Sequence, residues 1–230
     1  MINKRYKDIF NSFIYKGEKT PFSIGTLVVF ALCFILLIVA TFTQIPIPIP
    51  YFVNSEAGLF EFKTLLYNPQ ICAMILCIYL LKRTYSYFLF ALYLIVGIFI
   101  APIFVFGFGL EVFQSYLFGY FLGFGFAIFI AGSIFNLAHT LKARLLGSIL
   151  GVISIHLTGI VYCFILALFN AIDFSLLSPI YATVTGSKIF YDITFSILIM
   201  LLAPYIKNVF WLCMKPKLER NKSKNIGVRS

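Results

Sequence analysis

Long apolar runs, separated by short polar or proline-containing breaks, dominate this chain. A helix rises about 1.5 Å per residue, so about 20 apolar residues are needed to cross a hydrocarbon core about 30 Å thick. Most of the runs approach that length, and the run that ends at Lys82 and Arg83 is shorter. The pattern predicts six transmembrane helices, over residues 22–44, 70–81, 85–106, 114–137, 145–169 and 187–214.

The first break opens with TFTQIPIPIPYF, residues 41–52, in which three Ile-Pro pairs follow the first predicted helix. Proline has no backbone donor and favours an extended backbone, so these pairs end the helix. One interpretation is a stiff lid across the mouth of the bundle, because an ordered segment loses less entropy when it closes over a ligand. The other is that the prolines only terminate the helix. A further proline, Pro102, is expected within the last turn of the third helix.

The composition agrees with a membrane protein. Of the 230 residues, 61% are hydrophobic and 11% are charged, whereas soluble domains are about half apolar and about one quarter charged. The expected fold class is an all-α polytopic protein of the cell membrane. Residues 22–214 form its membrane domain, and residues 1–21 and 215–230 are basic cytoplasmic segments.

Basic residues are distributed unevenly between the predicted loops. If the N-terminus is cytoplasmic, all of the 18 Lys and Arg residues except Lys63 and Lys188 lie on the cytoplasmic side. An excess of Lys and Arg marks cytoplasmic loops, and an even number of spans brings the C-terminus back to the same side. Both termini are therefore expected in the cytoplasm. The net charge of +10 then needs no nucleic acid, because the basic ends contact anionic lipid of the bilayer.

No motif for an enzymatic reaction is present in the sequence. There is neither a Gly-x-x-x-x-Gly-Lys phosphate loop nor a His-Glu-x-x-His zinc helix, and the five cysteines fall in predicted helices, where they serve apolar packing. His156 lies in the middle of the fifth helix and has two open interpretations, a proton relay or a neutral imidazole bonded to a neighbouring helix. We expect no catalytic residue, no metal and no cofactor.

Polar or rigid features converge on the predicted outer face. They are the Ile-Pro segment, Gln70, the FGFG turn at residues 106–109, the start of the fourth helix, and Asp192. Pockets between the helices of a bundle are mostly apolar with a few placed polar groups, so one interpretation is a small-molecule site that opens outward. The alternative is that aromatic residues only anchor these loops at the membrane interface.

Four segments in order carry a resemblance to a known family. They are QIPIPIP at 44–50, ALYLIVGIFIAPIF at 91–104, GYFLGF at 119–124 and DITFSILIMLLAP at 192–204. Over about residues 31–206 the chain resembles BioY, the biotin-binding membrane subunit of energy-coupling factor transporters. The resemblance implies a six-helix bundle like that of other S components, which captures biotin at the extracellular face. It also implies two kinds of partner, a transmembrane coupling subunit and cytoplasmic ATPases.

The resemblance further implies which side chains hold the ligand. Asp192 falls on the aspartate of the family's sixth helix, and Tyr120 falls on the tyrosine of its fourth helix. Gln70 corresponds to the glutamine that starts the second helix. Tyr162 falls where many members have a tryptophan, and Phe108 falls near the asparagine of the turn after the third helix.

Two departures from the family leave alternatives open. Phe195 stands at the position of the family's lysine, and the FGFGLE turn lacks the asparagine. Lys188, one turn before Asp192, is expected to replace the missing cation if the last helix begins early. Because lost polar partners lower affinity, the alternatives to biotin are another small vitamin-like ligand or a non-catalytic membrane assembly role. Asp192 itself has a second interpretation, which is that it only complements the positive start of its helix.

Overall fold

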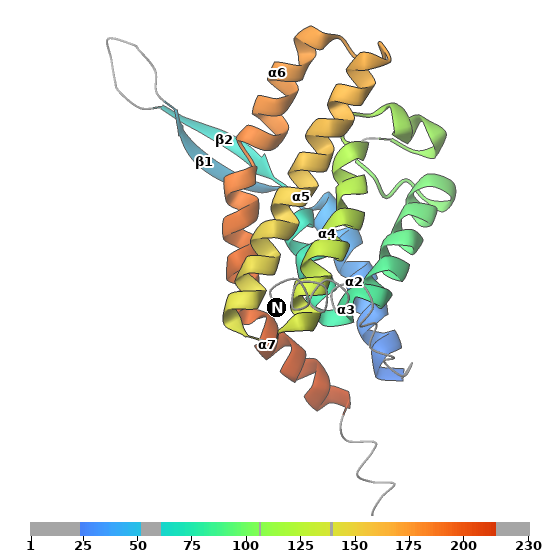
Figure 1. Ribbon diagram of the computed structural model, residues 1–230, viewed down its shortest axis with the longest axis vertical. Helices are drawn as coiled ribbons and strands as arrows, with labels where there is room; N and C mark the ends of the chain where they lie inside the picture. Colours follow the sequence, from blue (N-terminus) through green and yellow to red (C-terminus); the bar gives the residue numbers. More distant parts are fainter. Residues whose placement is uncertain (1–23, 52–60, 106, 139, 215–230) are drawn as a thin grey trace, which may run out of the picture.

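Helices make up most of the structure and run along one long axis (Figure 1). The computed structural model describes residues 24–51, 61–105, 107–138 and 140–214. The expected basic segments, residues 1–21 and 215–230, lie outside the described residues. Five described helices are long and apolar enough to cross a membrane: Gly25–Phe42, Gln70–Ile100, Phe118–Leu137, Leu141–Leu168 and Phe174–Phe210.

The elements follow one another in a simple order. The long helices are α2 (Ile24–Phe42), α3 (Gln70–Ile95), α4 (Phe118–Leu137), α5 (Leu141–Leu168) and α7 (Ile189–Met214). Strands β1 (Ile45–Tyr51) and β2 (Glu61–Tyr67) lie between α2 and α3. Short turns extend or precede the long helices: η1 (Val96–Ile100), η2 (Gly109–Gln114), η3 (Phe174–Leu176), α6 (Leu177–Ile180) and η4 (Tyr181–Gly186).

The helix α3 reverses direction at Lys82. This residue has a φ of 63° and a ψ of 171°, which are not helical values. The Nε2 atom of Gln70 donates a hydrogen bond of 2.8 Å to the Tyr93 hydroxyl, across a sequence separation of 23 residues. In a straight helix these two residues would lie about 35 Å apart. α3 therefore contains the second and third predicted spans as an antiparallel pair, and the expected six helices are confirmed.

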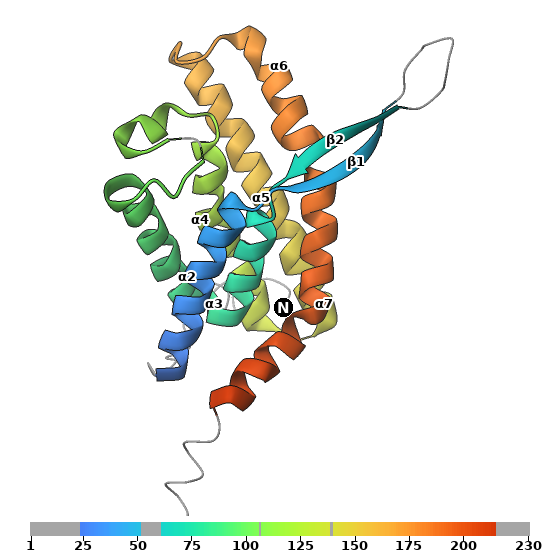
Figure 2. The ribbon, with the colours of Figure 1, turned by 180° about the vertical axis from the view of Figure 1, so that it is seen from behind.

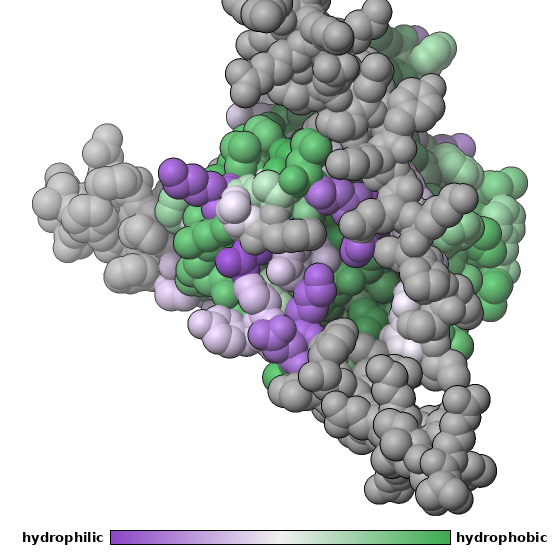
Figure 3. Space-filling view, turned by 60° about the horizontal axis from the view of Figure 1, so that its bottom comes forward, coloured by the Kyte–Doolittle hydropathy of each residue, from purple (hydrophilic) through white to green (hydrophobic). Residues whose placement is uncertain are grey.

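The start of α2 and the end of α7 lie at the same end of the bundle (Figures 1 and 2). The turn of α3 and the start of α5 lie there too, and Arg83 next to this turn donates from Nη1 to Ser133 near the end of α4 over 3.1 Å. Figure 3 brings this end forward and shows hydrophilic residues gathered on it. The shared side of the described ends agrees with an even number of spans, and the cytoplasmic location of that side stays a prediction.

The Ile-Pro segment is a strand, which adds a β-hairpin to the expected helical bundle. β1 pairs antiparallel with β2, with Ile45 opposite Tyr67. Alternate residues of an edge strand direct their N–H groups away from the partner, so prolines at every second position need not remove a ladder hydrogen bond. The hairpin projects from the side of the bundle (Figures 1 and 2). The described part of the Ile-Pro segment is extended, as expected. Its strand points away from the bundle and not across its mouth, so the interpretation as a lid is wrong for the described residues.

Several helix boundaries differ from the predicted ones for local reasons. The third span ends at Ile100 rather than at residue 106, because Ala101 is extended, with a φ of −146° and a ψ of 144°. A residue before proline avoids helical angles, so Pro102 lies beyond the helix and not in its last turn. The Oγ1 atom of Thr140 accepts from the backbone N–H of Ala143 over 3.3 Å. This cap starts α5 at residue 141, four residues earlier than predicted.

The apolar pattern misplaced one further start, that of α4, and predicted the start of the last helix within two residues. α4 begins at Phe118 rather than at residue 114, because residues 109–114 form the separate turn η2. α7 begins at Ile189, two residues after the predicted start at residue 187, and the shorter elements η3, α6 and η4 precede it from Phe174. The polar residues of η4 had placed that stretch in a predicted loop.

Small residues allow α4 and α5 to approach closely. A Cβ atom on Gly123 would lie 2.7 Å from the Cα atom of Ile155, and one on Gly159 would lie 2.6 Å from the ring of Tyr120. Small residues at such contacts let helices pack within a membrane, where the hydrophobic effect does not drive their association. This packing brings Tyr120 against α5.

Gly123→Ala is expected to lower the melting temperature of the detergent-purified protein by several degrees. The added methyl group would meet the backbone of Ile155, and overpacking of this kind costs about 1–3 kcal/mol. Gly125→Ala is the matched control, because its Cβ atom would meet only the ring of Phe90, at 3.5 Å. Equal melting temperatures of the Gly123→Ala and Gly125→Ala proteins would contradict this account of the contact.

Candidate functional site

Asp192 lies in the first turn of α7 and is 2% exposed. Its Oδ1 atom accepts a hydrogen bond of 2.9 Å from the Tyr67 hydroxyl, and its Oδ2 atom lies 3.0 Å from Nε2 of His156. A buried carboxylate without such partners is costly in the interior of a protein or membrane. Both oxygens are therefore satisfied by other elements, so the contacts of Asp192 extend beyond the start of its own helix.

Tyr67 is the last residue of β2, and its side chain is 1% exposed. Its hydroxyl also lies 2.9 Å from Sγ of Cys72, and its ring packs on Phe195 with 5.0 Å between the centroids. Burial, together with the nearby carboxylate of Asp192, raises the pKa of the Tyr67 hydroxyl. The hydroxyl therefore stays protonated and donates to that carboxylate. The base of the hairpin is thus joined to α7.

His156 stands on α5 between two polar partners and is 2% exposed. Its Nε2 atom faces Asp192, and its Nδ1 atom lies 3.4 Å from Oγ1 of Thr185. The imidazole also meets the ring of Tyr120 edge-on, with 5.7 Å between the centroids. Of the two interpretations that the sequence left open, the structure agrees with an imidazole bonded to a neighbouring helix.

Thr185 and Tyr120 complete a continuous polar chain. The Tyr120 hydroxyl lies 2.7 Å from Oγ1 of Thr185, and Tyr120 is 7% exposed. The chain, named here the polar chain, consists of Tyr67, Asp192, His156, Thr185 and Tyr120. Its members come from β2, α7, α5, η4 and α4, so it ties together elements that are distant in the sequence.

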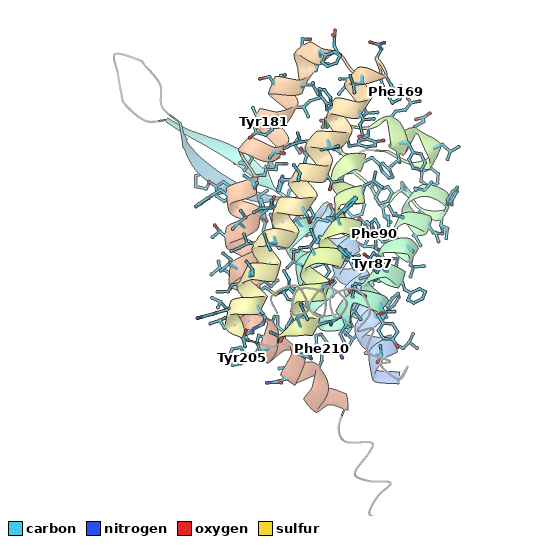
Figure 4. The ribbon with its side chains drawn as sticks, viewed as in Figure 1. Tyr87, Phe90, Phe169, Tyr181, Tyr205 and Phe210 are labelled. Atoms are coloured by element: carbon cyan, nitrogen blue, oxygen red, sulfur yellow. The ribbon has the colours of Figure 1, made fainter. Side chains whose placement is uncertain are left out.

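A cavity of about 270 Å³ adjoins one end of the polar chain. Its walls are mostly apolar and include Tyr120 of α4, Cys163 and Phe164 of α5, and Leu177, Ile180 and Tyr181 of α6 and η4. Figure 4 shows Tyr181 on the upper part of the long helical stretch that ends in α7. Tyr120 is the member of the polar chain that lines this cavity, together with Ser178 and Tyr181, which also carry hydroxyl groups.

Gln70 belongs to a second polar cluster, at the start of α3. Its Nε2 atom donates to Oγ1 of Thr41 over 3.1 Å and to the Tyr93 hydroxyl over 2.8 Å. The hydroxyl oxygens of Thr41 and Tyr93 are themselves 2.7 Å apart. This cluster joins α2 to both halves of α3. In the described part of the chain, no hydrogen bond joins Gln70 to the polar chain.

The other expected site residues lie outside the polar chain. The Tyr162 hydroxyl donates to the backbone carbonyl of Phe113, and its ring packs on Phe118. Phe108 precedes η2 and is 46% exposed. Lys188 accepts the backbone hydrogen bond of Asp192 over 2.9 Å.

The expected replacement of the missing cation by Lys188 stays a prediction, and among the described residues the side chain within ion-pair distance of Asp192 is that of His156. In the part of the chain that the structure describes, the side-chain partners of Asp192 are Tyr67 and His156. Lys188 precedes the first residue of α7, where its backbone rather than its ammonium meets Asp192. His156 occupies the place beside the carboxylate.

The structure therefore unites two of the expected site residues, Asp192 and Tyr120, through residues that the site prediction did not include. Tyr67 and Thr185 lay in predicted loops, and no local pattern distinguished them. His156 had a signal, a polar side chain in the middle of an apolar helix, but the sequence did not indicate its partners. Only the packing of α5 against α7 and η4 reveals them.

The fold and this site define a polytopic membrane protein with a small, mostly apolar cavity beside a buried polar chain. The sequence model of the BioY family matches residues 17–211. The chain belongs to the BioY family, so the resemblance seen in its sequence is confirmed.

A solved structure has a similar fold. It is described as the S-component for biotin from an ECF-type ABC transporter, and it is 18% identical to this chain. The TM-score is 0.56, and the match covers 80% of this chain and 90% of the other. No curated protein matches the chain.

Tyr67→Phe is expected to reduce the free energy of unfolding by about 1.5–3 kcal/mol, because it removes a donor from a buried carboxylate. Tyr87→Phe is the matched control. The Tyr87 hydroxyl donates to the carbonyl of Gly125 over 3.3 Å on an exposed side chain (Figure 4), and its loss is expected to cost less than about 0.5 kcal/mol. Denaturation of the two purified variants measures the difference, and equal stabilities would show that the bond to Asp192 contributes little.

Proposed function

We propose that this chain is the substrate-binding membrane subunit of a vitamin-uptake transporter and that its ligand is biotin. Membership in the BioY family and the fold shared with an S-component for biotin support the proposal. The observation that carries it is the cavity beside Tyr120, where three residues with hydroxyl groups, Tyr120, Ser178 and Tyr181, meet mostly apolar walls. Sites for small molecules combine these features.

The size and lining of the cavity suit a compact ligand with a small polar head. Ligand pockets are typically about 300–1,000 Å³, and this cavity, at about 270 Å³, is slightly smaller than that range. Biotin presents a ureido group, with two N–H donors and one carbonyl, on a ring system and chain that are otherwise apolar apart from the carboxylate. In the proposed pose, the ureido group faces Tyr120 and the apolar rings contact the walls.

Asp192 acts in this proposal through the polar chain. Its carboxylate orients His156, and His156 and Thr185 in turn orient Tyr120. Gln70 supports the start of α3 through Tyr93. Phe108, Tyr162 and Lys188 remain proposed contacts of the route by which the ligand enters: Phe108 and Tyr162 are placed near η2, and Lys188 precedes α7.

Energy for uptake would come from partners. The chain has no phosphate-binding loop of the Gly-x-x-x-x-Gly-Lys type. We propose that it associates in the cell membrane with a transmembrane coupling subunit and cytoplasmic ATPases. The similar solved structure, an S-component from an ECF-type ABC transporter, supports this proposal. The membrane-capable helices of the chain agree with this location.

Tyr120→Phe is expected to weaken biotin binding about 5- to 10-fold, because one neutral hydrogen bond contributes about 1 kcal/mol. Binding of radiolabelled biotin to the protein in lipid nanodiscs measures the affinity, with riboflavin and thiamine as competitors. Tyr205→Phe is the matched control, since Tyr205 is 71% exposed and lies far below Tyr181 on the same helical stretch (Figure 4). A wild-type protein that binds no biotin would refute the proposed function, and full affinity in Tyr120→Phe would refute this site.

A further inference from the structure

We propose that His156 and Thr185 hold the Tyr120 hydroxyl as a hydrogen-bond acceptor toward the cavity, so that the site selects ligands that present an N–H donor there. This inference rests on the proposed function and adds the residues that decide the chemical class of the ligand. Neither His156 nor Thr185 is among the residues that line the cavity. They act as positioning residues, through Tyr120.

The order of hydrogen-bond donors and acceptors along the polar chain is set at Asp192. An ionised carboxylate can only accept hydrogen bonds, so the proton between Asp192 and His156 resides on Nε2 of the imidazole. The Tyr67 hydroxyl donates to the other carboxylate oxygen over 2.9 Å. Asp192 therefore accepts two hydrogen bonds and donates none.

In the proposed arrangement the His156 ring is neutral. Its Nε2 atom lies 3.0 Å from Oδ2 of Asp192, and its Nδ1 atom lies 3.4 Å from Oγ1 of Thr185. A neutral imidazole with its proton on Nε2 has a bare Nδ1, which is an acceptor. The hydroxyl of Thr185 is therefore the donor in the longer contact.

The last donor of the polar chain is the Tyr120 hydroxyl. Because the hydrogen of Thr185 points to Nδ1 of His156, its oxygen is free to accept the Tyr120 hydroxyl hydrogen across 2.7 Å. The phenol cannot easily turn away, since its ring lies flat against Gly159 and edge-on to His156. In the proposed arrangement, the lone pairs of the Tyr120 oxygen remain for a ligand in the cavity that Tyr120 lines.

A site in which the Tyr120 oxygen acts as an acceptor favours one class of ligand. An N–H group, such as those of a cyclic urea, would donate to the Tyr120 oxygen. An isostere with an oxygen atom at that position would place two acceptors against each other. Sites built to bond an N–H or O–H group reject analogues that lack it, because the buried partner is left unpaired.

The test compares biotin with its two cyclic carbamate analogues, in each of which a ring oxygen replaces one ureido N–H. Wild-type protein in nanodiscs is expected to bind biotin about tenfold or more tightly than at least one analogue. Thr185→Val keeps the shape of the side chain but frees the Tyr120 proton, so the preference is expected to fall below about threefold. Thr185→Ser, which keeps the hydroxyl, is expected to restore it.

Thr183→Val is the matched control. Thr183 lies in the same turn, its side chain is exposed, and its hydroxyl donates to the carbonyl of Pro179 over 2.8 Å. The preference for biotin is expected to be unchanged in this variant. Equal affinities of the wild type for biotin and both carbamates would overturn the inference, and so would a full preference in Thr185→Val.

A second measurement decides the inference without biotin. The chain has two histidines, so ¹⁵N spectra of histidine-labelled protein contain two rings, and the signal lost in His156→Gln identifies His156. The expected form is neutral, with the proton on Nε2. A proton on Nδ1, in a neutral or a charged ring, would overturn the inference. A wild-type protein that binds neither biotin nor the carbamates would refute the proposed function. The spectrum would still decide which nitrogen of His156 carries the proton.

Discussion

The buried carboxylate of Asp192 is the constraint on which the site depends. A charge in the interior of a membrane bundle is tolerated only when its hydrogen bonds are satisfied. Here one oxygen is bonded by the hairpin and the other by α5. The requirement therefore draws β2, α5 and α7 to one point and holds them in one relative arrangement.

From that point the polar chain continues to the cavity. In the proposed arrangement, the orientation of the Tyr120 hydroxyl follows from the carboxylate through His156 and Thr185. The glycines of α4 and α5 make this possible, because Gly159 leaves space for the ring of Tyr120. Tyr120 lines a mostly apolar cavity, and in sites of this kind a few placed polar groups provide specificity.

The helices were accessible from the sequence because their signals are local. Apolar length and the break at Lys82 define the spans, and the structure reverses the chain at that residue. The boundaries at Thr140 and Phe174 were less accessible, because a cap and a polar turn decide them rather than hydrophobicity. The pairing of β1 with β2 depends on a partner strand that follows later in the chain, and the proline pattern alone indicated only an extended backbone.

The sequence by itself determined the membrane class, the number of helices, the family, and the unusual polar residues Asp192, Tyr120 and His156. Those features rest on composition, on local periodicity and on ordered motifs. Only the tertiary structure decided that His156 rather than Lys188 stands beside Asp192, that Tyr67 closes one end of the chain, and that Gln70 lies in a separate cluster. The physical reason is that hydrogen-bond partners depend on distances between helices, and these distances are set by packing.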